Sequence, residues 1–378
     1  MGVSQNLNYL NNGRTMLEKP KIQRRESTKI YVGNVPIGGD APIAVQSMTN
    51  TRTTDVEATV AQIKSLERVG ADIVRVSVPT MEAAEAFKLI KQQVSVPLVA
   101  DIHFDYKLAL AAIDSGADKI RINPGNIGSI DRVRAVVNEA RMAHIPIRVG
   151  VNSGSLEKDI LDKYGKVTAR GLCDSALRNV AIIEDMGFDD IVVSLKSSDV
   201  RMNYEAHRLI AQETEHPIHI GITEAGTVKR GKLKSAIGIG SLLLDGVGDT
   251  MRVSLTANPV EEVLFAKEIL ETIGLREANY DLVSCPTCGR TSVNLEELAE
   301  KIDRRLADEN VREGIKVAVM GCVVNGPGEA KGADYGVAGG MHKGVIFEKG
   351  EVVKTVKEED IIDELFNLIY EREGKTIR

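Results

Sequence analysis

The sequence of 378 residues contains no tryptophan, few other aromatic residues and no long hydrophobic run. Its longest apolar stretch, residues 237–244, is interrupted by glycines and a serine, whereas a membrane-spanning helix needs about 20 apolar residues. Acidic residues outnumber basic ones by 54 to 48, so the formal charge is −6. Nucleic-acid-binding proteins rely on basic patches and aromatic stacking surfaces. The composition therefore argues against both a membrane and a nucleic-acid partner.

The first 26 residues are polar and lack the apolar core of a secretory signal. We therefore expect a flexible N-terminal extension without chemistry of its own and a cytoplasmic protein. Four cysteines do not form a disulfide framework in a chain of this length, and a reducing compartment keeps them as thiols. Cys173 lies among apolar residues and is predicted to be a core residue. The other three fall in the last quarter of the chain, where clustered thiols indicate metal binding or redox chemistry.

From residue 43 onward, a short β-rich apolar run alternates with a segment of helical periodicity, and such runs begin at residues 43, 72, 97, 119, 146, 190, 217 and 250. Eight alternations predict a (β/α)8 barrel, which typically takes about 250 residues. A doubly wound open sheet is the alternative, but eight regular units without a break in the middle favour closure. We therefore expect a TIM barrel over residues 27–275. This range begins with a hairpin at residues 29–37, which turns at Gly33-Asn34.

The pattern changes after residue 275, and residues 276–378 are predicted to form a small α+β domain. Strands are expected at 282–285, 316–320, 344–348 and 352–355, and helices at 293–305 and 358–370. The glycines between residues 326 and 344 indicate a loop there. This domain carries the three clustered cysteines.

Polar side chains gather at the predicted carboxyl ends of the barrel strands, where the catalytic groups of such barrels lie. They occur two residues apart, or four apart with a glycine between, so both members of a pair point to the same side. The pairs are Arg75 and Ser77, Asp101 and His103, Arg121 and Asn123, Arg148 and Asn152, Ser194 and Lys196, His219 and Thr223, and Arg252 and Ser254. This pattern predicts a barrel mouth that holds a compact, highly anionic ligand. The alternative is a structural network in which the buried cations pair with Asp101 and Glu224.

Cys285 and Cys288 form a Cys-Pro-Thr-Cys turn, and Cys322 follows 34 residues later in a glycine-rich segment that continues to Glu329. Two interpretations are open. A zinc-ribbon knuckle needs two more good ligands, and His342 is the only histidine in this domain. An iron–sulfur cluster held by three cysteines leaves one iron with a weaker ligand or an open position, which the carboxylate of Glu329 can fill. The absence of a second Cys-x-x-Cys pair favours the cluster.

Long contiguous motifs make the chain similar to a known family; they are AVQSMTNTRTTDVEATVAQI, GADIVRVSVPT, PLVADIHFDY, RINPGNIG, GITEAG, CPTC and GCVVNGPGEA. With these motifs the chain closely resembles the bacterial 4-hydroxy-3-methylbut-2-en-1-yl diphosphate synthases of the non-mevalonate isoprenoid pathway, from about residue 23 to its end. The resemblance implies an N-terminal barrel and a C-terminal [4Fe-4S] domain. It also implies reductive ring opening of 2-C-methyl-D-erythritol 2,4-cyclodiphosphate to (E)-4-hydroxy-3-methylbut-2-enyl diphosphate, with loss of one hydroxyl as water.

The resemblance further implies the electron source, the assembly and the roles of individual residues. Electrons arrive singly from reduced flavodoxin or ferredoxin, and the family forms homodimers with shared sites. The cluster ligands match Cys285, Cys288, Cys322 and, as the displaceable fourth, Glu329. The diphosphate contacts match Arg52, Arg121, Arg148, Lys196, Arg252 and Ser254, with Asn123 as a further predicted substrate contact. The groups near the reacting carbons match Asp101, His103, Asn152 and Glu224.

Two hypotheses concern mechanism and assembly. Glu224 is the candidate general acid for the departing oxygen, with its carboxyl kept protonated by burial. The chain leaves a barrel of this kind opposite its mouth, and residues 274–280 reach at most about 25 Å at about 3.5 Å per residue. A head-to-tail homodimer, in which each cysteine domain covers the partner's barrel, resolves this constraint. The rival functions are a redox-silent barrel transferase with a structural zinc domain, such as a pterin-condensing enzyme, and a zinc-ribbon interaction module.

Overall fold

The computed structural model describes residues 22–374 except 310, 312–313, 323–327, 329 and 341. The chain divides into two compact units, and the boundary falls between Ile269 and Leu270. This boundary lies within helix α10 (Pro259–Thr272). The sequence predicted a boundary between residues 275 and 276, slightly later in the chain. None of the helices in the described residues combines the length and the apolar character that a bilayer crossing requires.

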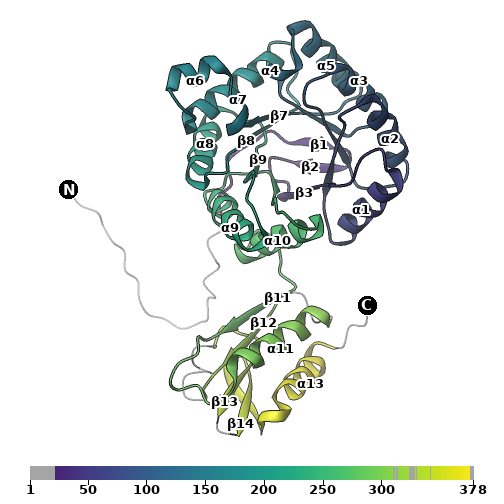
Figure 1. Cartoon of the computed structure of the whole chain (residues 1–378). Helices are drawn as coiled ribbons and strands as arrows, with labels where there is room; N and C mark the ends of the chain where they lie inside the picture. The colour runs from purple at the N-terminus through teal and green to yellow at the C-terminus, as the bar shows by residue number, and fades with distance from the viewer. Residues whose placement is uncertain are drawn as a thin grey trace, which may run out of the picture. The chain divides into compact units, whose positions relative to one another are not determined.

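The first unit is a barrel of eight parallel strands surrounded by helices (Figure 1). Hydrogen-bonded neighbours follow the order β8-β7-β6-β5-β4-β3-β10-β9, and a parallel bridge between Val193 and Ile218 joins β8 to the residue before β9. The strands are β3 (Ala44–Met48), β4 (Ile73–Ser77), β5 (Leu98–Asp101), β6 (Lys119–Ile122), β7 (Ile147–Asn152), β8 (Ile191–Lys196), β9 (His219–Gly221) and β10 (Thr250–Arg252). This closure confirms the predicted TIM barrel and excludes the open doubly wound sheet.

Helices follow the strands in regular alternation. They are α1 (Val56–Arg68), α2 (Met81–Lys91), α3 (Tyr106–Asp114), α4 (Pro124–Ile127), α5 (Ile130–Met142), α6 (Lys158–Tyr164), α7 (Ala169–Glu184), α8 (Val200–Glu213), α9 (Val228–Leu244) and α10. Asp55 and Thr80 cap α1 and α2, because their side chains accept hydrogen bonds from the backbone N–H groups of Ala58 and Ala83. The expected core residue Cys173 is fully buried in α7.

A short hairpin of β1 (Ile30–Val32) and β2 (Val35–Ile37) packs against the amino ends of the barrel strands. It turns at Gly33, whose φ of 57° suits glycine. One apolar cluster joins the hairpin to the first inward-facing residues of four strands; it consists of Ile30, Val32, Ile37, Ala44, Ile73, Val99 and Val192. This cluster covers part of the amino end of the barrel with apolar side chains.

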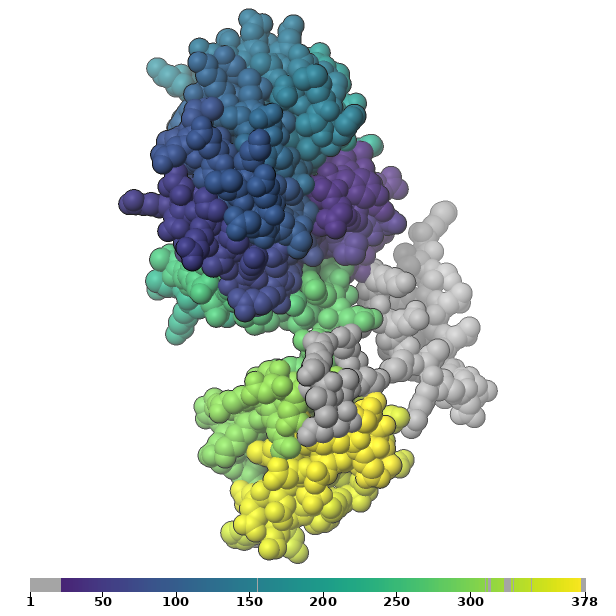
Figure 2. All heavy atoms as spheres, turned by 90° about the vertical axis from the view of Figure 1, so that its right-hand side faces the viewer, coloured from purple at the N-terminus to yellow at the C-terminus, as the bar shows by residue number. Residues whose placement is uncertain are grey.

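The described residues just before the hairpin form hydrogen bonds and ion pairs with the barrel. For this stretch they correct the prediction that residues 1–26 are a flexible extension. Arg24 Nη2 lies 3.0 Å from Oδ1 of the buried Asp249, and Ser27 Oγ donates to the same oxygen at 2.8 Å. Arg25 donates hydrogen bonds to two backbone carbonyl oxygens that precede β9. In Figure 2 these first described residues, in purple, lie on the surface of the barrel unit. Residues 1–21 lie outside the described residues.

The second unit is a five-stranded mixed sheet with helices α11 (Leu295–Asp308) and α13 (Ile361–Glu373) packed against one face. The strands lie in the order β11 (Tyr280–Ser284), β12 (Ile315–Met320), β13 (Tyr335–Gly340), β14 (Lys343–Glu348) and β15 (Glu351–Lys357). The first three are parallel, and β14 and β15 continue the sheet in antiparallel pairing. The predicted α+β class is confirmed.

Strand β13 corrects the prediction of a glycine-rich loop over residues 326–344. Its glycines make room for neighbouring side chains. A Cβ on Gly336 would lie 2.3 Å from Cζ of Phe347, and one on Gly339 would lie 2.4 Å from Cγ2 of Val293. Because glycine in a strand also marks a close approach of another group, composition alone could not separate this strand from a loop.

Candidate active site

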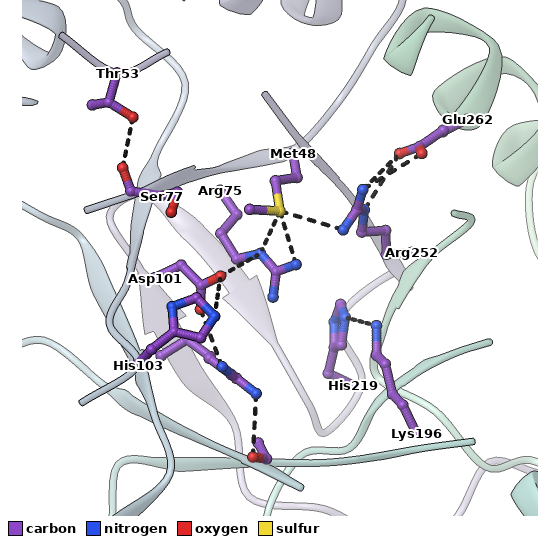
Figure 3. Close-up of polar contacts among 12 residues, drawn as sticks. Met48, Thr53, Arg75, Ser77, Asp101, His103, Lys196, His219, Arg252 and Glu262 are labelled. Atoms are coloured by element: carbon purple, nitrogen blue, oxygen red, sulfur yellow. Dashed lines mark hydrogen bonds and ion pairs between the residues drawn. The ribbon is translucent and has the colours of Figure 1, made fainter. Parts of the chain in front are cut away.

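Seven barrel strands present a charged or polar side chain to the barrel interior: Arg75 (β4), Asp101 (β5), Arg121 (β6), Arg148 (β7), Lys196 (β8), His219 (β9) and Arg252 (β10). Figure 3 labels five of them, Arg75, Asp101, Lys196, His219 and Arg252. Alternate residues of a strand face the barrel interior. In the parallel register, Asp101 pairs with Arg121, and Arg121 pairs with Arg148. The fold therefore assembles most of the polar strand ends that the sequence predicted as one site.

The carboxylate of Asp101 is buried among cations. Its oxygens lie 3.4 Å from Arg121 Nη1, 3.8 Å from Arg75 Nε and 4.0 Å from Nε2 of the exposed His103. Burial alone would raise the pKa of the Asp101 carboxyl, but Arg75, Arg121 and Arg148 outweigh burial and hold this pKa below its usual value. Asp101 is therefore an anion that orients two arginines.

Arg252 is held by Glu262, a residue of α10 that the sequence analysis did not identify. Arg252 Nη2 lies 3.3 Å from Oε2 of this buried carboxylate, and Oε1 also accepts the Leu255 N–H at 2.9 Å. The sulfur of Met48, at the end of β3, lies 2.9 Å from Arg75 Nη2 and 3.4 Å from Arg252 Nη1 (Figure 3). The structural network considered from the sequence thus exists in part, with Glu262 in place of Glu224.

Other buried cations in the barrel have no carboxylate partner. Lys119, two residues before Arg121 in β6, is completely buried, and among the described residues its Nζ has no hydrogen-bond partner. Nε and Nη1 of Arg148, which is 1% exposed, likewise have none within the described part of the chain. Burial, reinforced by the neighbouring cations, lowers the pKa of Lys119, Arg148 and Lys196 well below its usual value. Arg75, Arg121 and Arg252 bring the number of these interior cations to six. Among the described residues, the carboxylates that pair with them are Asp101 and Glu262.

Two strand glycines make space for these cations. A Cβ on Gly150 of β7 would lie 2.5 Å from Arg121 Nε and 2.9 Å from Arg121 Nη2. A Cβ on Gly221 of β9 would lie 3.0 Å from Lys196 Nζ and 2.6 Å from the carbonyl oxygen of Arg252. The guanidinium of Arg121 therefore lies across a strand that has no side chain at this point, and Arg121 Nη2 donates to the Gly150 carbonyl oxygen at 3.3 Å.

The remaining predicted barrel residues lie on or next to the loops at the same end. Arg52 is exposed after β3, Ser254 and Asn152 are partly buried, and Asn123 is buried and caps α4 by accepting the Gly125 N–H at 3.2 Å. Glu224 follows β9 with a φ of 51° and is exposed within the barrel unit. The barrel unit by itself therefore leaves Glu224 exposed, and its burial in a site shared between chains stays a prediction.

The cysteines of the second unit lie at one edge of its sheet. Cys285 directly follows β11, and Cys322 follows β12, the parallel neighbour of β11. Cys285 Sγ accepts the Gly321 N–H at 3.2 Å, and the Ser292 N–H donates to the Gly321 carbonyl oxygen at 3.2 Å, which ties the Cys288 turn to the same edge. Hydrogen bonds from Arg290 hold the pKa of the Cys288 thiol below its usual value.

The chemistry of these residues fits an iron–sulfur cluster. All three cysteines are free thiols, and the N–H bond to Cys285 Sγ is of the kind that tunes cluster sulfurs. Within the described residues, no three potential ligands converge on the position of a single metal ion. A cluster spreads its ligands over several irons, so it does not require that convergence. The fourth predicted ligand, Glu329, lies outside the described residues.

Comparison with known proteins agrees with this geometry. The model of the GcpE TIM-barrel domain matches residues 27–267, and that of the GcpE protein C-terminal domain matches residues 281–371. The chain belongs to the GcpE family. GcpE relatives named 4-hydroxy-3-methylbut-2-en-1-yl diphosphate synthase (flavodoxin) include that of Pasteurella multocida, 58% identical over 93% of this chain and 95% of its own length. That of Clostridium acetobutylicum is 56% identical over 92% of this chain and 99% of its own length. The predicted family membership is confirmed.

Among solved structures, the dihydropteroate synthase of Stenotrophomonas maltophilia covers 65% of this GcpE chain and 97% of its own, with a TM-score of 0.48 and 14% identity. This likeness is too distant to bear on function. The GcpE assignment itself replaces the pterin-condensing and zinc-module readings.

Sequence reasoning missed several residues of this GcpE site. Lys119 carried a usable signal, because it precedes Arg121 by two residues in a strand and so faces the same side. Glu262 and Met48 carried none, because their contacts with Arg252 join residues 10 and 204 positions apart.

Proposed function

We propose that this chain catalyses the reductive ring opening of 2-C-methyl-D-erythritol 2,4-cyclodiphosphate to (E)-4-hydroxy-3-methylbut-2-enyl diphosphate, an enzymatic step of the non-mevalonate isoprenoid pathway. Its relatives carry the name of that synthase. The observation that supports this substrate most directly is the surplus of buried cations in the barrel interior. A cyclic diphosphate brings the missing negative charge in a compact form, and oxyanions accept the strong charge-assisted hydrogen bonds that guanidinium groups donate.

The binding roles follow from which donors are left over. Arg148 has two buried nitrogen atoms without partners in the described residues, so we assign it the most deeply placed diphosphate contact. Arg121 and Arg252 are already oriented by Asp101 and Glu262 and keep further N–H groups for the ligand. Lys196, Asn123, Ser254 and Arg52 complete the proposed contacts. Asp101, His103 and Asn152 are proposed to surround the reacting carbons.

The cluster residues supply the redox half of the proposed site. Cys285, Cys288, Cys322 and Glu329 would hold a [4Fe-4S] cluster, which supplies single electrons and a Lewis-acidic iron with a replaceable ligand. Reduced flavodoxin, which the relatives' name includes, or ferredoxin is the proposed electron donor. Such a cluster needs thiolates and a reducing compartment, so we place the enzyme in the cytoplasm.

Glu224 is the proposed general acid for the departing hydroxyl. Its loop follows β9 at the mouth, next to the strand ends that carry the cations. Replacement by Gln keeps the size and removes the exchangeable proton. We expect Glu224→Gln to lose turnover while it keeps iron content and substrate binding. Near-normal turnover would remove Glu224 from this role.

The connection between the units supports a homodimer with shared sites. Helix α10 ends at Thr272 and β11 begins at Tyr280, so residues 273–279 join them. These residues span at most about 25 Å, whereas α10 runs back from the mouth toward the amino end of the barrel, as helices of this fold do. We infer that the cysteine unit of one chain serves the barrel of a second chain.

Mixing two inactive chains tests this assembly. A Cys322→Ala chain lacks a cluster ligand, and an Arg148→Ala chain lacks a diphosphate contact. In a mixed dimer, one of the two shared sites contains neither change, so partial activity should return. Absence of recovery, with mixed dimers verified by differently tagged chains, would place the complete site within one chain.

Anaerobic purification tests the function as a whole. We expect a brown protein with absorbance near 400 nm, about four irons and four sulfides per chain, and turnover of the cyclic diphosphate with reduced flavodoxin. A colourless protein that holds only a divalent ion and still turns over would overturn the proposal.

A further inference from the structure

A chain of three buried polar side chains runs through the barrel interior from β8 to β10. Lys196 Nζ lies 3.2 Å from His219 Nε2, and His219 Nδ1 lies 2.6 Å from Thr250 Oγ1. Lys196 is 8% exposed, whereas His219 and Thr250 are completely buried. Lys196 and His219 point toward each other in Figure 3. The imidazole is therefore held at both ring nitrogens.

The partners determine which ring nitrogen carries the proton. With Lys196 as an ammonium, which can only donate hydrogen bonds, Nε2 of His219 accepts. The proton of the neutral ring then lies on Nδ1 and is donated to the hydroxyl oxygen of Thr250. Burial, and then the positive charges of Lys196, Arg148, Lys119 and Arg75, lower the pKa of His219 well below its usual value, so the ring is neutral at pH 7.

A neutral acceptor has a different effect from a carboxylate. Glu262 orients Arg252 but also cancels its charge. An imidazole orients an ammonium and leaves its charge in place. Two other cations of the same mouth pair with the Asp101 carboxylate and also have a neutral acceptor. Arg75 donates to the sulfur of Met48, and Arg121 donates to the carbonyl oxygen of Gly150. The mouth thus fixes several cations while it keeps a positive surplus.

We propose that His219 is a positioning residue, which holds the Lys196 ammonium at the carboxyl end of β8 with its charge uncompensated for an anionic ligand. Thr250 acts through His219, because its oxygen holds the proton on Nδ1 and so keeps Nε2 free to accept. The identity of the anion as a diphosphate rests on the proposed function, whereas the Lys196–His219–Thr250 arrangement does not.

Binding of inorganic pyrophosphate to the full-length holoenzyme tests the proposal by calorimetry at pH 7.5. His219→Leu removes the acceptor, and we expect affinity to fall about ten- to a hundredfold, which corresponds to the loss of a hydrogen bond to a charged group. His219→Gln retains a neutral acceptor and should bind within about threefold of the wild type. Thr250→Val should weaken binding about fivefold or more, and Thr250→Ser should restore it.

His207→Leu is the matched control, because His207 is equally buried but lies in α8, where its Nδ1 contacts the Asn203 carbonyl oxygen. It should leave pyrophosphate affinity unchanged. A folded His219→Leu protein that binds like the wild type, or a His219→Gln protein that binds as weakly as His219→Leu, would overturn the proposal. If His219→Leu does not fold, equal affinities of the Thr250→Val and Thr250→Ser proteins would overturn it.

Nitrogen-15 NMR of the histidine rings tests the arrangement independently of activity. With pyrophosphate bound at pH 7.5, we expect the His219 signals, identified by their loss in His219→Gln, to show a protonated Nδ1 and an unprotonated Nε2. A protonated Nε2 would overturn the proposal. If the wild type binds neither pyrophosphate nor the cyclic diphosphate, the proposed function fails. NMR of the free holoenzyme then tests the arrangement by itself: a protonated Nδ1 supports the proposal, and a protonated Nε2 overturns it.

Discussion

Replacing Gly150 by alanine is expected to disturb ligand binding through Arg121 alone. The added Cβ would lie 2.5 Å from Arg121 Nε and 2.9 Å from Arg121 Nη2, whereas nonbonded contacts prefer about 3.5 Å or more. The guanidinium must therefore retreat by about 1 Å. The contact belongs to the end of a flexible side chain, so the barrel should still fold, with a loss of about 1–3 kcal/mol in the free energy of unfolding.

The retreat of Arg121 separates it from Asp101 Oδ1, now 3.4 Å from Nη1, and from the Gly150 carbonyl oxygen, now 3.3 Å from Nη2. Misplacing one charged hydrogen-bond donor costs about 1.5–3 kcal/mol, which corresponds to about a ten- to hundredfold weaker affinity for pyrophosphate. Calorimetry on the holoenzyme measures this affinity.

A matched control and a double mutant separate this cause from a general disturbance. Gly154 follows in the same segment, and a Cβ there would meet no atom within 4 Å, so Gly154→Ala should bind normally. In an Arg121→Ala background the space beside Gly150 is empty, and Gly150→Ala should then have no further effect. Equal losses from Gly150→Ala in both backgrounds, or normal binding by the single variant, would refute this reasoning.

Three further predictions concern stability and the cluster. His207 is fully buried, and its pKa is lowered to about 4. Between about pH 6.5 and 4.5 the unfolded chain therefore binds a proton at this residue that the folded chain does not bind. The free energy of unfolding should fall by about 2–3 kcal/mol over this range. Urea unfolding of the wild type and of His207→Leu measures this loss, which the variant should lack; equal losses would contradict it. Anaerobically purified Cys285→Ala, Cys288→Ala and Cys322→Ala proteins should lose iron, whereas Cys173→Ala should keep it, and full iron in any of the first three would count against that ligand. A chain that begins at Ser27 should unfold about 1–3 kcal/mol more easily than one that begins at Ile22, because Asp249 loses Arg24 and Arg25; identical urea midpoints would show that these contacts contribute nothing.

The successes of the sequence analysis came from periodic or contiguous signals. Strand parity places Arg75, Asp101, Arg121 and Arg148 on the interior face, because alternation is a local property of each strand. Its errors came from features that have two local explanations. The glycines of β13 indicated a loop, but Gly336 and Gly339 instead leave room for Phe347 and Val293, which lie elsewhere in the chain.

The sequence by itself determined the barrel, the α+β unit, the family and the residue types of both halves of the site. Each of these follows from spacing along the chain. Only the tertiary structure decided which cations meet a carboxylate and which do not. Arg252 meets Glu262, Lys196 meets His219, and Arg148 has two buried nitrogens without partners in the described residues. These contacts form when the sheet closes and brings together strands that are far apart in the sequence, and no local pattern encodes that distance.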